Sequence, residues 1–109
     1  MAEFDPEKFE DKYEHYFPEL QRAYRQAFET MNDAYDSELV HAIDQQLLAE
    51  SEPFYEGEGE FRVALPEDPA DTLTGVLVDD EKLAAVLDRY VDEIEAELQQ
   101  VFGFADSLH

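Results

Sequence analysis

Residues 79–103 read DDEKLAAVLDRYVDEIEAELQQVFG, and this stretch decides the fold. Apolar residues recur in it every three or four positions, which is the spacing of one face of an α-helix. The members of this stripe are Leu83, Leu87, Tyr90, Ile94, Leu98 and Val101. Asp79 is suited to cap the helix N-terminus, and Gly103 is suited to a left-handed C-terminal residue. The stretch therefore predicts a long helix with one buried face, and Phe104 is placed to fold back on Leu98.

A second apolar stripe begins near the N-terminus and predicts another helix. Its members are Phe9, Tyr13, Phe17, Leu20, Tyr24, Ala27, Phe28 and Met31. Asp5 and Pro6 suit the cap and the first position of this helix, and Phe4 and Phe9 stand at the two positions of a hydrophobic staple. Pro18 cannot donate a hydrogen bond to the preceding turn, so we expect a kink or two stacked segments there.

The middle of the chain changes from a helical to a strand pattern. Residues 38–50 predict a second helix, capped by the polar cluster around Asp36. Apolar and polar residues alternate over 61–65, which predicts a half-buried strand, and the glycines before it permit a tight reversal. Residues 66–72 are interpreted as a surface connection, and residues 73–78 are expected to form a further strand.

These elements together predict an α+β fold. It has a kinked N-terminal helix, a second helix, a small antiparallel β-meander of two or three strands, and a long C-terminal helix packed on one face of the sheet. Residues 1–104 are expected to form a single acidic domain, and residues 105–109 a frayed C-terminal tail. No apolar run approaches the roughly 18 residues of a membrane span, and no export signal is recognisable at the N-terminus. We therefore expect a cytoplasmic protein without a membrane partner.

The large excess of acidic over basic residues is the most informative feature of the composition. The 109 residues include 29 Asp and Glu but only 7 Lys and Arg, which gives a formal net charge of -22. The many carboxylates of the folded chain repel one another, and either concentrated salt or a cationic partner relieves this repulsion. Lysine is scarce as well, and short carboxylates hold water and cations such as K+ with little exposed apolar area. The composition therefore predicts adaptation to concentrated salt.

The same charge also has a functional interpretation. Direct nucleic-acid binding is opposed, because no basic stripe is present to displace counterions from phosphates. An acidic polyanion mimic could instead occupy the basic groove of a nucleic-acid-binding partner. Acids lie on every expected element, however, which suits a solvated surface better than a dedicated stripe.

The composition of the whole chain, with the opening from Phe4 through Leu20, resembles the small acidic uncharacterised proteins that halophilic archaea encode. This resemblance implies a salt-accumulating source and a cytoplasmic compartment. The resemblance implies no activity, and it identifies no functional residues in this sequence.

Metal binding has one candidate pair. Glu38 and His41 are three residues apart and share a helix face, as in bundle sites that hold two iron or manganese ions. Such sites need two pairs, so a homodimer would have to supply the second. A solvent-facing or core-edge histidine is the simpler interpretation. No other motif predicts a catalytic residue or a cofactor, and we expect a protein that is not an enzyme.

Arg22 and Arg25 are neighbours on one helix face. Glu19 and Glu29 lie within a turn of them, so local ion pairs are the favoured interpretation. Recognition of an acidic ligand is the alternative.

Fourteen aromatic residues, 6 Tyr and 8 Phe, are many for a domain of this size. Tyr16, Tyr35, Phe54, Tyr55 and Phe104 fall off the main stripes or at the ends of elements. Ordinary closure of the core is one interpretation, and contact with a protein partner or a second copy is the other. The sequence therefore predicts a protein–protein interaction or self-associating module.

Overall fold

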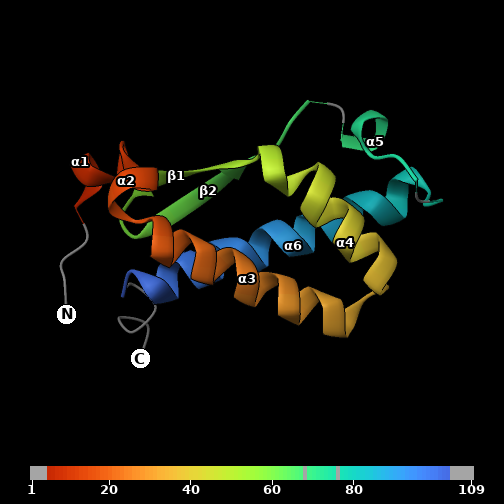
Figure 1. The fold of residues 1–109 in the computed structure, drawn as a ribbon, viewed down its shortest axis with the longest axis horizontal. Helices are drawn as coiled ribbons and strands as arrows, with labels where there is room; N and C mark the ends of the chain where they lie inside the picture. Colours follow the sequence, from red (N-terminus) through yellow and green to blue (C-terminus); the bar gives the residue numbers. More distant parts are fainter. Residues whose placement is uncertain (1–4, 68, 76, 104–109) are drawn as a thin grey trace.

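The computed structural model describes residues 5–67, 69–75 and 77–103, except for the side chains of residues 69 and 70. Two long antiparallel helices run side by side along the molecule, with a β-hairpin near one end (Figure 1). In chain order the elements are α1 (Pro6–Phe9), α2 (Lys12–His15), α3 (Phe17–Ala34), α4 (Ser37–Gln46), the 3₁₀ helix η1 (Leu48–Glu50), β1 (Glu52–Gly57), β2 (Glu60–Ala64), α5 (Pro69–Thr72) and α6 (Asp80–Val101). The predicted α+β class is confirmed.

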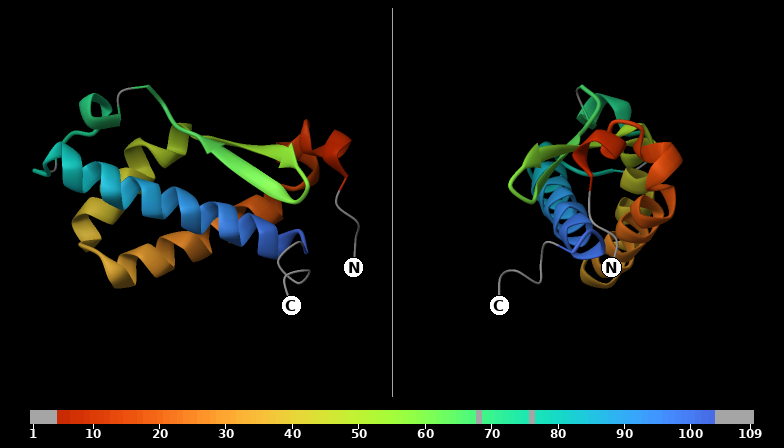
Figure 2. Two further views of the ribbon diagram at one scale, coloured as in Figure 1. Left: turned by 180° about the vertical axis from the view of Figure 1, so that it is seen from behind. Right: turned by 90° about the vertical axis from the view of Figure 1, so that its left-hand side faces the viewer.

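The seam between α3 and α6 forms the centre of the core, and Figure 2 shows the two helices end-on. Ala23 and Ala27 are fully buried on α3, because small side chains let the two helices approach closely. Most of the predicted face of α6 is buried. The buried members are Leu83, Leu87, Tyr90, Ile94 and Leu98, and Val86 joins them. Apolar burial along this seam is therefore the main stabilising interaction.

Both predicted ends of α6 are confirmed. The Asp79 carboxylate accepts a hydrogen bond from the Lys82 backbone N–H at 2.8 Å, which satisfies one of the orphan amides of the first turn. Gly103 follows the helix with φ of +85°, the left-handed conformation that glycine adopts without steric cost. Phe104 and the tail expected over residues 105–109 lie outside the described residues.

The N-terminal region is more segmented than the sequence predicts. Asp5 caps α1 by accepting from the Glu7 N–H at 2.9 Å, as expected. Two breaks then separate α1, α2 and α3, and Pro18 lies in the first turn of α3, where its missing N–H costs nothing. The staple between Phe4 and Phe9 cannot be followed, because Phe4 lies outside the described residues.

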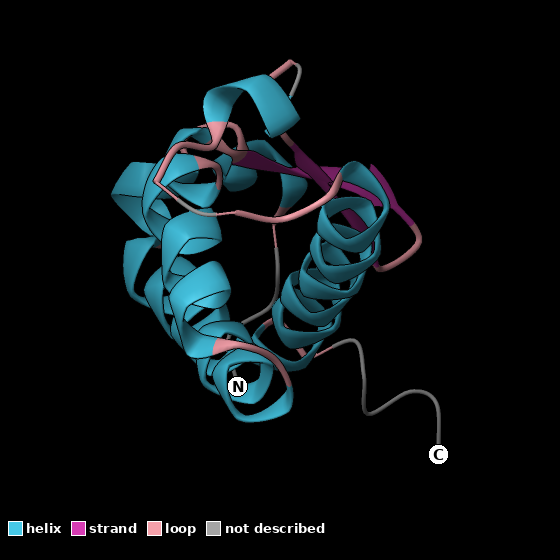
Figure 3. Cartoon of the chain, turned by 90° about the vertical axis from the view of Figure 1, so that its right-hand side faces the viewer, coloured by secondary structure: helices cyan, strands magenta, loops and turns pink. Residues whose placement is uncertain are grey.

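The β-hairpin is antiparallel and packs against α6. Tyr55 pairs with Phe61 and Gly57 with Glu60, with an irregularity between Tyr55 and Gly57 where the chain reverses. Figure 3 shows the two strands lying over α6. Glu95 on α6 accepts a hydrogen bond from the Val63 N–H at 3.2 Å. The C-terminal helix therefore covers one face of the sheet, as predicted, and also forms a hydrogen bond with β2.

The link between the hairpin and α6 differs from the prediction. Residues 66–72 are not only a connection, since the short helix α5 forms within them. The expected strand at 73–78 is wrong for the residues of this stretch that the structure describes, because none of them pairs with β1 or β2. The side chain of Gln46 holds this segment instead. It donates to the Thr74 carbonyl at 2.8 Å and accepts from the Thr74 N–H at 2.7 Å.

The second helix also ends differently. The predicted helix over 38–50 is α4 followed by the 3₁₀ turn η1, and the Asp36 carboxylate caps it by accepting from the Glu38 N–H at 3.3 Å. Across the described parts of the chain, no helix has the length and apolar character needed to cross a membrane.

Candidate functional site

Two of the predicted partner-binding aromatics lie inside the fold. Tyr16 is half-buried, and its hydroxyl accepts a hydrogen bond from the Asp5 N–H at 3.0 Å while its ring packs edge-on against Phe102 at 5.0 Å. Tyr55 packs against Phe61 at 5.2 Å, and its hydroxyl accepts from an amide of the hairpin turn. Both residues therefore contribute to closure of the core.

The other two predicted aromatics are more accessible. Phe54 is half-buried, and its ring lies 5.2 Å from the Lys12 ammonium and 5.0 Å from the Arg62 guanidinium. Tyr35 is exposed at the C-terminal end of α3. The structure therefore does not bring Tyr16, Tyr35, Phe54 and Tyr55 together into one surface patch.

Two aromatic residues that the sequence placed in the buried stripe are instead exposed. Tyr13 is 57% exposed and Phe17 is 46% exposed. The prediction is wrong here because the chain breaks at Tyr16, so α2 and α3 are not one helix and the stripe does not continue across the break. The break near Pro18 agrees with the kink or two stacked segments expected there, but the predicted stripe extends across it.

Tyr13 and Phe17 border an apolar hollow of about 200 Å³, which we call the aromatic groove. Its walls come from α2, the first two turns of α3, η1 and the start of β1. The lining residues are Tyr13, Phe17, Leu20, Gln21, Tyr24, Leu48, Ala49, Ser51 and Pro53. Exposed aromatic rings beside an apolar hollow are typical of the anchor regions of protein interfaces.

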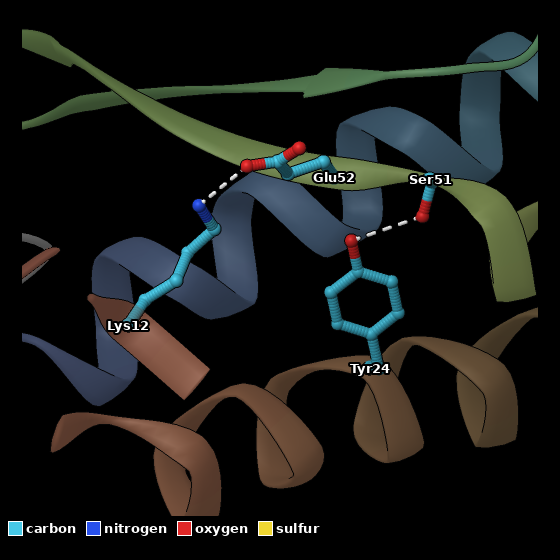
Figure 4. Close-up of polar contacts among 4 residues, drawn as sticks. All are labelled: Lys12, Tyr24, Ser51 and Glu52. Atoms are coloured by element: carbon cyan, nitrogen blue, oxygen red, sulfur yellow. Dashed lines mark hydrogen bonds and ion pairs between the residues drawn. The ribbon is translucent and has the colours of Figure 1, made fainter. Parts of the chain in front are cut away.

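A hydrogen-bonded pair fixes the floor of the aromatic groove (Figure 4). The Ser51 hydroxyl donates to the Leu48 carbonyl at 2.7 Å, so the Tyr24 hydroxyl, 3.2 Å away, donates to Ser51. Burial raises the pKa of Tyr24 to about 12, and its hydroxyl therefore keeps its proton at neutral pH. The pair connects α3 to the segment that leads into β1.

A buried lysine, Lys12, lies next to Tyr13 in the sequence and contacts its ring from outside the aromatic groove. Lys12 is 4% exposed, and its ammonium lies 2.8 Å from a carboxylate oxygen of Glu52, as Figure 4 shows. It also lies 5.2 to 5.3 Å from the ring centres of Phe9, Tyr13 and Phe54, within the range of cation–π attraction. The lysine therefore joins α2, including Tyr13, to β1.

We expect Glu52→Gln to lower the free energy of unfolding by about 1–2 kcal/mol, less than for a fully buried pair because Glu52 is half-exposed. The substitution leaves the buried ammonium without its opposite charge. Lys12→Met keeps the apolar stem and should cost less. Glu56→Gln is the matched control at the exposed Arg62 ion pair and should change stability by under about 0.5 kcal/mol in urea unfolding. Equal effects of Glu52→Gln and Glu56→Gln would contradict this role of Lys12.

A second hollow lies beside the first, between α3 and α4, and we call it the arginine groove. Its volume is about 670 Å³, and it shares Gln21 and Tyr24 with the aromatic groove. The lining residues are Pro18, Gln21, Arg22, Tyr24, Arg25, Phe28 and Asp44. The favoured interpretation of Arg22 and Arg25 is not confirmed, because within the described residues neither forms an ion pair with Glu19 or Glu29.

The metal-binding candidates lie in the first half of α4, next to the arginine groove. His41 stacks edge-on against Phe28 at 4.9 Å, and its Nδ1 lies 2.9 Å from the Ser37 carbonyl oxygen. Since a carbonyl only accepts, Nδ1 carries the hydrogen of this bond. Among the residues the structure describes, no group of three or more His, Asp or Glu side chains is placed to hold a metal ion. The hypothesis for Glu38 and His41 requires a second copy of the chain and stays a prediction.

Carboxylates surround a third hollow, of about 450 Å³, between the hairpin and α6. Its acidic lining residues are Glu56, Glu60, Asp92 and Glu95. Burial raises the pKa of Glu95, and the charge of Asp92 acts in the same direction, against the opposing hydrogen bond from Val63. The charge of this hollow is thus opposite in sign to that of Arg22 and Arg25.

Comparison with known proteins gives one match. The model of a family described as "Family of unknown function (DUF5783)" matches residues 1–105 of the chain. No curated protein and no solved structure matches it.

Proposed function

The chain belongs to this family of unknown function, DUF5783, and on that premise we propose that it is a non-enzymatic module that binds a protein partner through the aromatic groove. The observation that carries the proposal is the exposure of Tyr13 and Phe17 beside an apolar hollow. Aromatic side chains that close on a pocket supply much of the binding energy of protein interfaces.

The size of the aromatic groove supports a protein side chain as the occupant. Its volume of about 200 Å³ is below the roughly 300–1,000 Å³ of most small-molecule sites. An apolar side chain of a partner protein can enter it and cover the Phe17 ring. The rigid support from Lys12 and Tyr24 reduces the entropy that binding would otherwise cost.

The net charge favours a different protein over a second copy of the chain. Each copy carries a formal charge of -22, so a homodimer would bring many carboxylates together at its interface, and concentrated salt screens only those more than a few ångströms apart. A partner with fewer acids, or with basic residues around its apolar anchor, is attracted instead. A homodimer is the contrasting outcome, and light scattering in concentrated KCl would detect it.

We also propose that the acidic coat is an adaptation to a salt-accumulating cytoplasm. Exposed carboxylates are spread over the long elements and the hairpin instead of forming one row. Examples are Glu10, Glu29, Asp33, Glu38, Glu56, Glu60, Glu81, Asp88 and Asp92. This even distribution supports salt adaptation over polyanion mimicry, which needs the charges on one face.

The test is affinity capture from a high-salt lysate with matched variants. Phe17→Ser should weaken retention of a partner at least tenfold, because truncating an interface anchor costs more than about 1.4 kcal/mol. Tyr35→Ser removes an exposed aromatic residue from the far end of α3 and should leave retention unchanged. Equal retention of the partner by wild type and by Phe17→Ser would contradict the proposal. Equal loss of the partner in Phe17→Ser and in Tyr35→Ser would contradict it too.

A further inference from the structure

The arginine groove contains two exposed arginines, Arg22 and Arg25, that form no ion pair with the described residues. Four of the five other side chains that line it are uncharged, and Asp44 is the fifth. Glu19 and Glu29 lie within one turn of Arg22 and Arg25, yet no ion pair joins them among the described residues. The Glu19 Oε1 atom is buried, with no hydrogen-bond partner in the described parts of the chain. The two guanidinium groups therefore remain available at the groove.

The other two arginines of the chain each form an ion pair. Arg89 pairs with Glu93 at 2.9 Å, and Arg62 pairs with Glu56 at 3.3 Å. Among the described residues, Lys8 and Lys82 form no ion pair either, so the absence of an ion pair is not by itself unusual for a basic side chain of this protein. What distinguishes Arg22 and Arg25 is that they line the same hollow, where a single anion can contact both guanidinium groups.

The geometry points to a carboxylate-binding site, and we propose that the arginine groove binds a carboxylate of the partner's polypeptide chain. Arg22 and Arg25 are three residues apart, so both lie on one side of α3 and can hold the two oxygens of one planar anion. Pro18 and the half-buried ring of Phe28 provide an apolar wall for the stem that carries the carboxylate.

The charge of the lining favours a carboxylate over a phosphate group. Two arginines and Asp44 leave one net positive charge, which a monoanion neutralises and a phosphate dianion exceeds. The Asp44 carboxyl can also accept a hydrogen bond from a backbone N–H beside the bound carboxylate.

The position of the arginine groove beside the aromatic groove predicts the spacing of the two groups by which the partner binds. This step rests on the proposed function. The two grooves meet at Gln21 and Tyr24. Phe17 precedes Arg22 and Arg25 by five and eight residues, or about 7–12 Å along a helix. An extended segment covers that span in roughly two to four residues. The partner therefore carries an apolar anchor and an Asp, a Glu or a C-terminal carboxylate at this separation.

The experiment is an NMR titration of the intact chain in about 0.5 M KCl, which leaves a Debye length of several ångströms. The probe is N-acetyl-glutamate N-methylamide, with its glutamine counterpart as the neutral control. The arginine Nε–Hε signals report binding. Saturable shifts at Arg22 and Arg25 are expected with the carboxylate alone. Arg22→Gln and Arg25→Gln should each weaken binding at least fivefold, whereas Arg89→Gln should not.

The remaining outcomes separate this inference from the proposed function. Phe17→Ser should bind the carboxylate probe like wild type, because it alters only the aromatic groove. The absence of saturation, or an equal response at Arg89, would overturn the carboxylate site and leave the aromatic groove untouched. Tighter binding of methyl phosphate than of the carboxylate by more than tenfold would overturn the assignment of the ligand class.

Discussion

In 2 M KCl the protein should melt at least about 10 °C above its melting temperature in 0.1 M KCl, because a relief of about 2 kcal/mol shifts a domain of this size by roughly that amount. Like charges one turn apart on a helix each cost about 0.2–0.5 kcal/mol. In α6 such pairs are Asp88 with Asp92, Asp92 with Glu95, and Glu93 with Glu97. Burial raises the pKa of Glu97, and the charge of Glu93 raises it further.

The physical cause of this salt effect is screening. The Debye length falls from about 10 Å at 0.1 M to about 3 Å at 1 M salt, so carboxylates one turn apart interact weakly in concentrated KCl. The matched control combines Asp88→Asn, Asp92→Asn and Glu97→Gln. This variant should melt higher than wild type in 0.1 M KCl and respond less to added salt. Equal melting temperatures of the wild type in both salt concentrations would contradict the account of the acidic coat.

Leu98→Ala should lower the free energy of unfolding by about 3 kcal/mol, within the range for a buried leucine. Leu98 is fully buried in the seam between α6 and α3. The close approach of α3 to α6 limits collapse around the cavity, so the lost contacts are only partly recovered. Urea unfolding in 2 M KCl measures the change, which is a large part of the stability of a small domain.

The chain offers a matched control for this substitution. Leu77 is completely exposed, so Leu77→Ala removes the same atoms without opening a cavity and should change stability by under about 0.5 kcal/mol. A loss of under 1 kcal/mol for Leu98→Ala would show that the seam between the two long helices is not the main source of stability.

The sequence predicts most of the helices and the hairpin correctly, because these depend on local patterns. The face of α6 follows from the spacing of its apolar residues, and its ends follow from Asp79 and Gly103. The expected strand at 73–78 fails because a strand needs a neighbour. Gln46 holds Thr74 through a contact 28 residues away along the chain, which no local pattern contains.

The candidate site is less predictable than the fold. A periodic pattern cannot identify where a helix breaks, so Tyr13 and Phe17 remain in the stripe until the change of direction at Tyr16 is known. The pairing of Arg22 and Arg25 depends on rotamers, and their neighbours along the helix do not determine it. The aromatic groove also requires packing between residues 13–24 and 48–53, which are distant in sequence.

The most direct test of the central claim, that the aromatic groove binds a protein, is site-specific photo-crosslinking in living cells. A benzoylphenylalanine side chain replaces Phe17, the first residue of α3, in one variant and Tyr35, which follows its last residue, in another, and both positions are exposed. The account predicts a discrete crosslinked product with a second protein at position 17 and none at position 35. The absence of a product at position 17, or the same product at both positions, would contradict it.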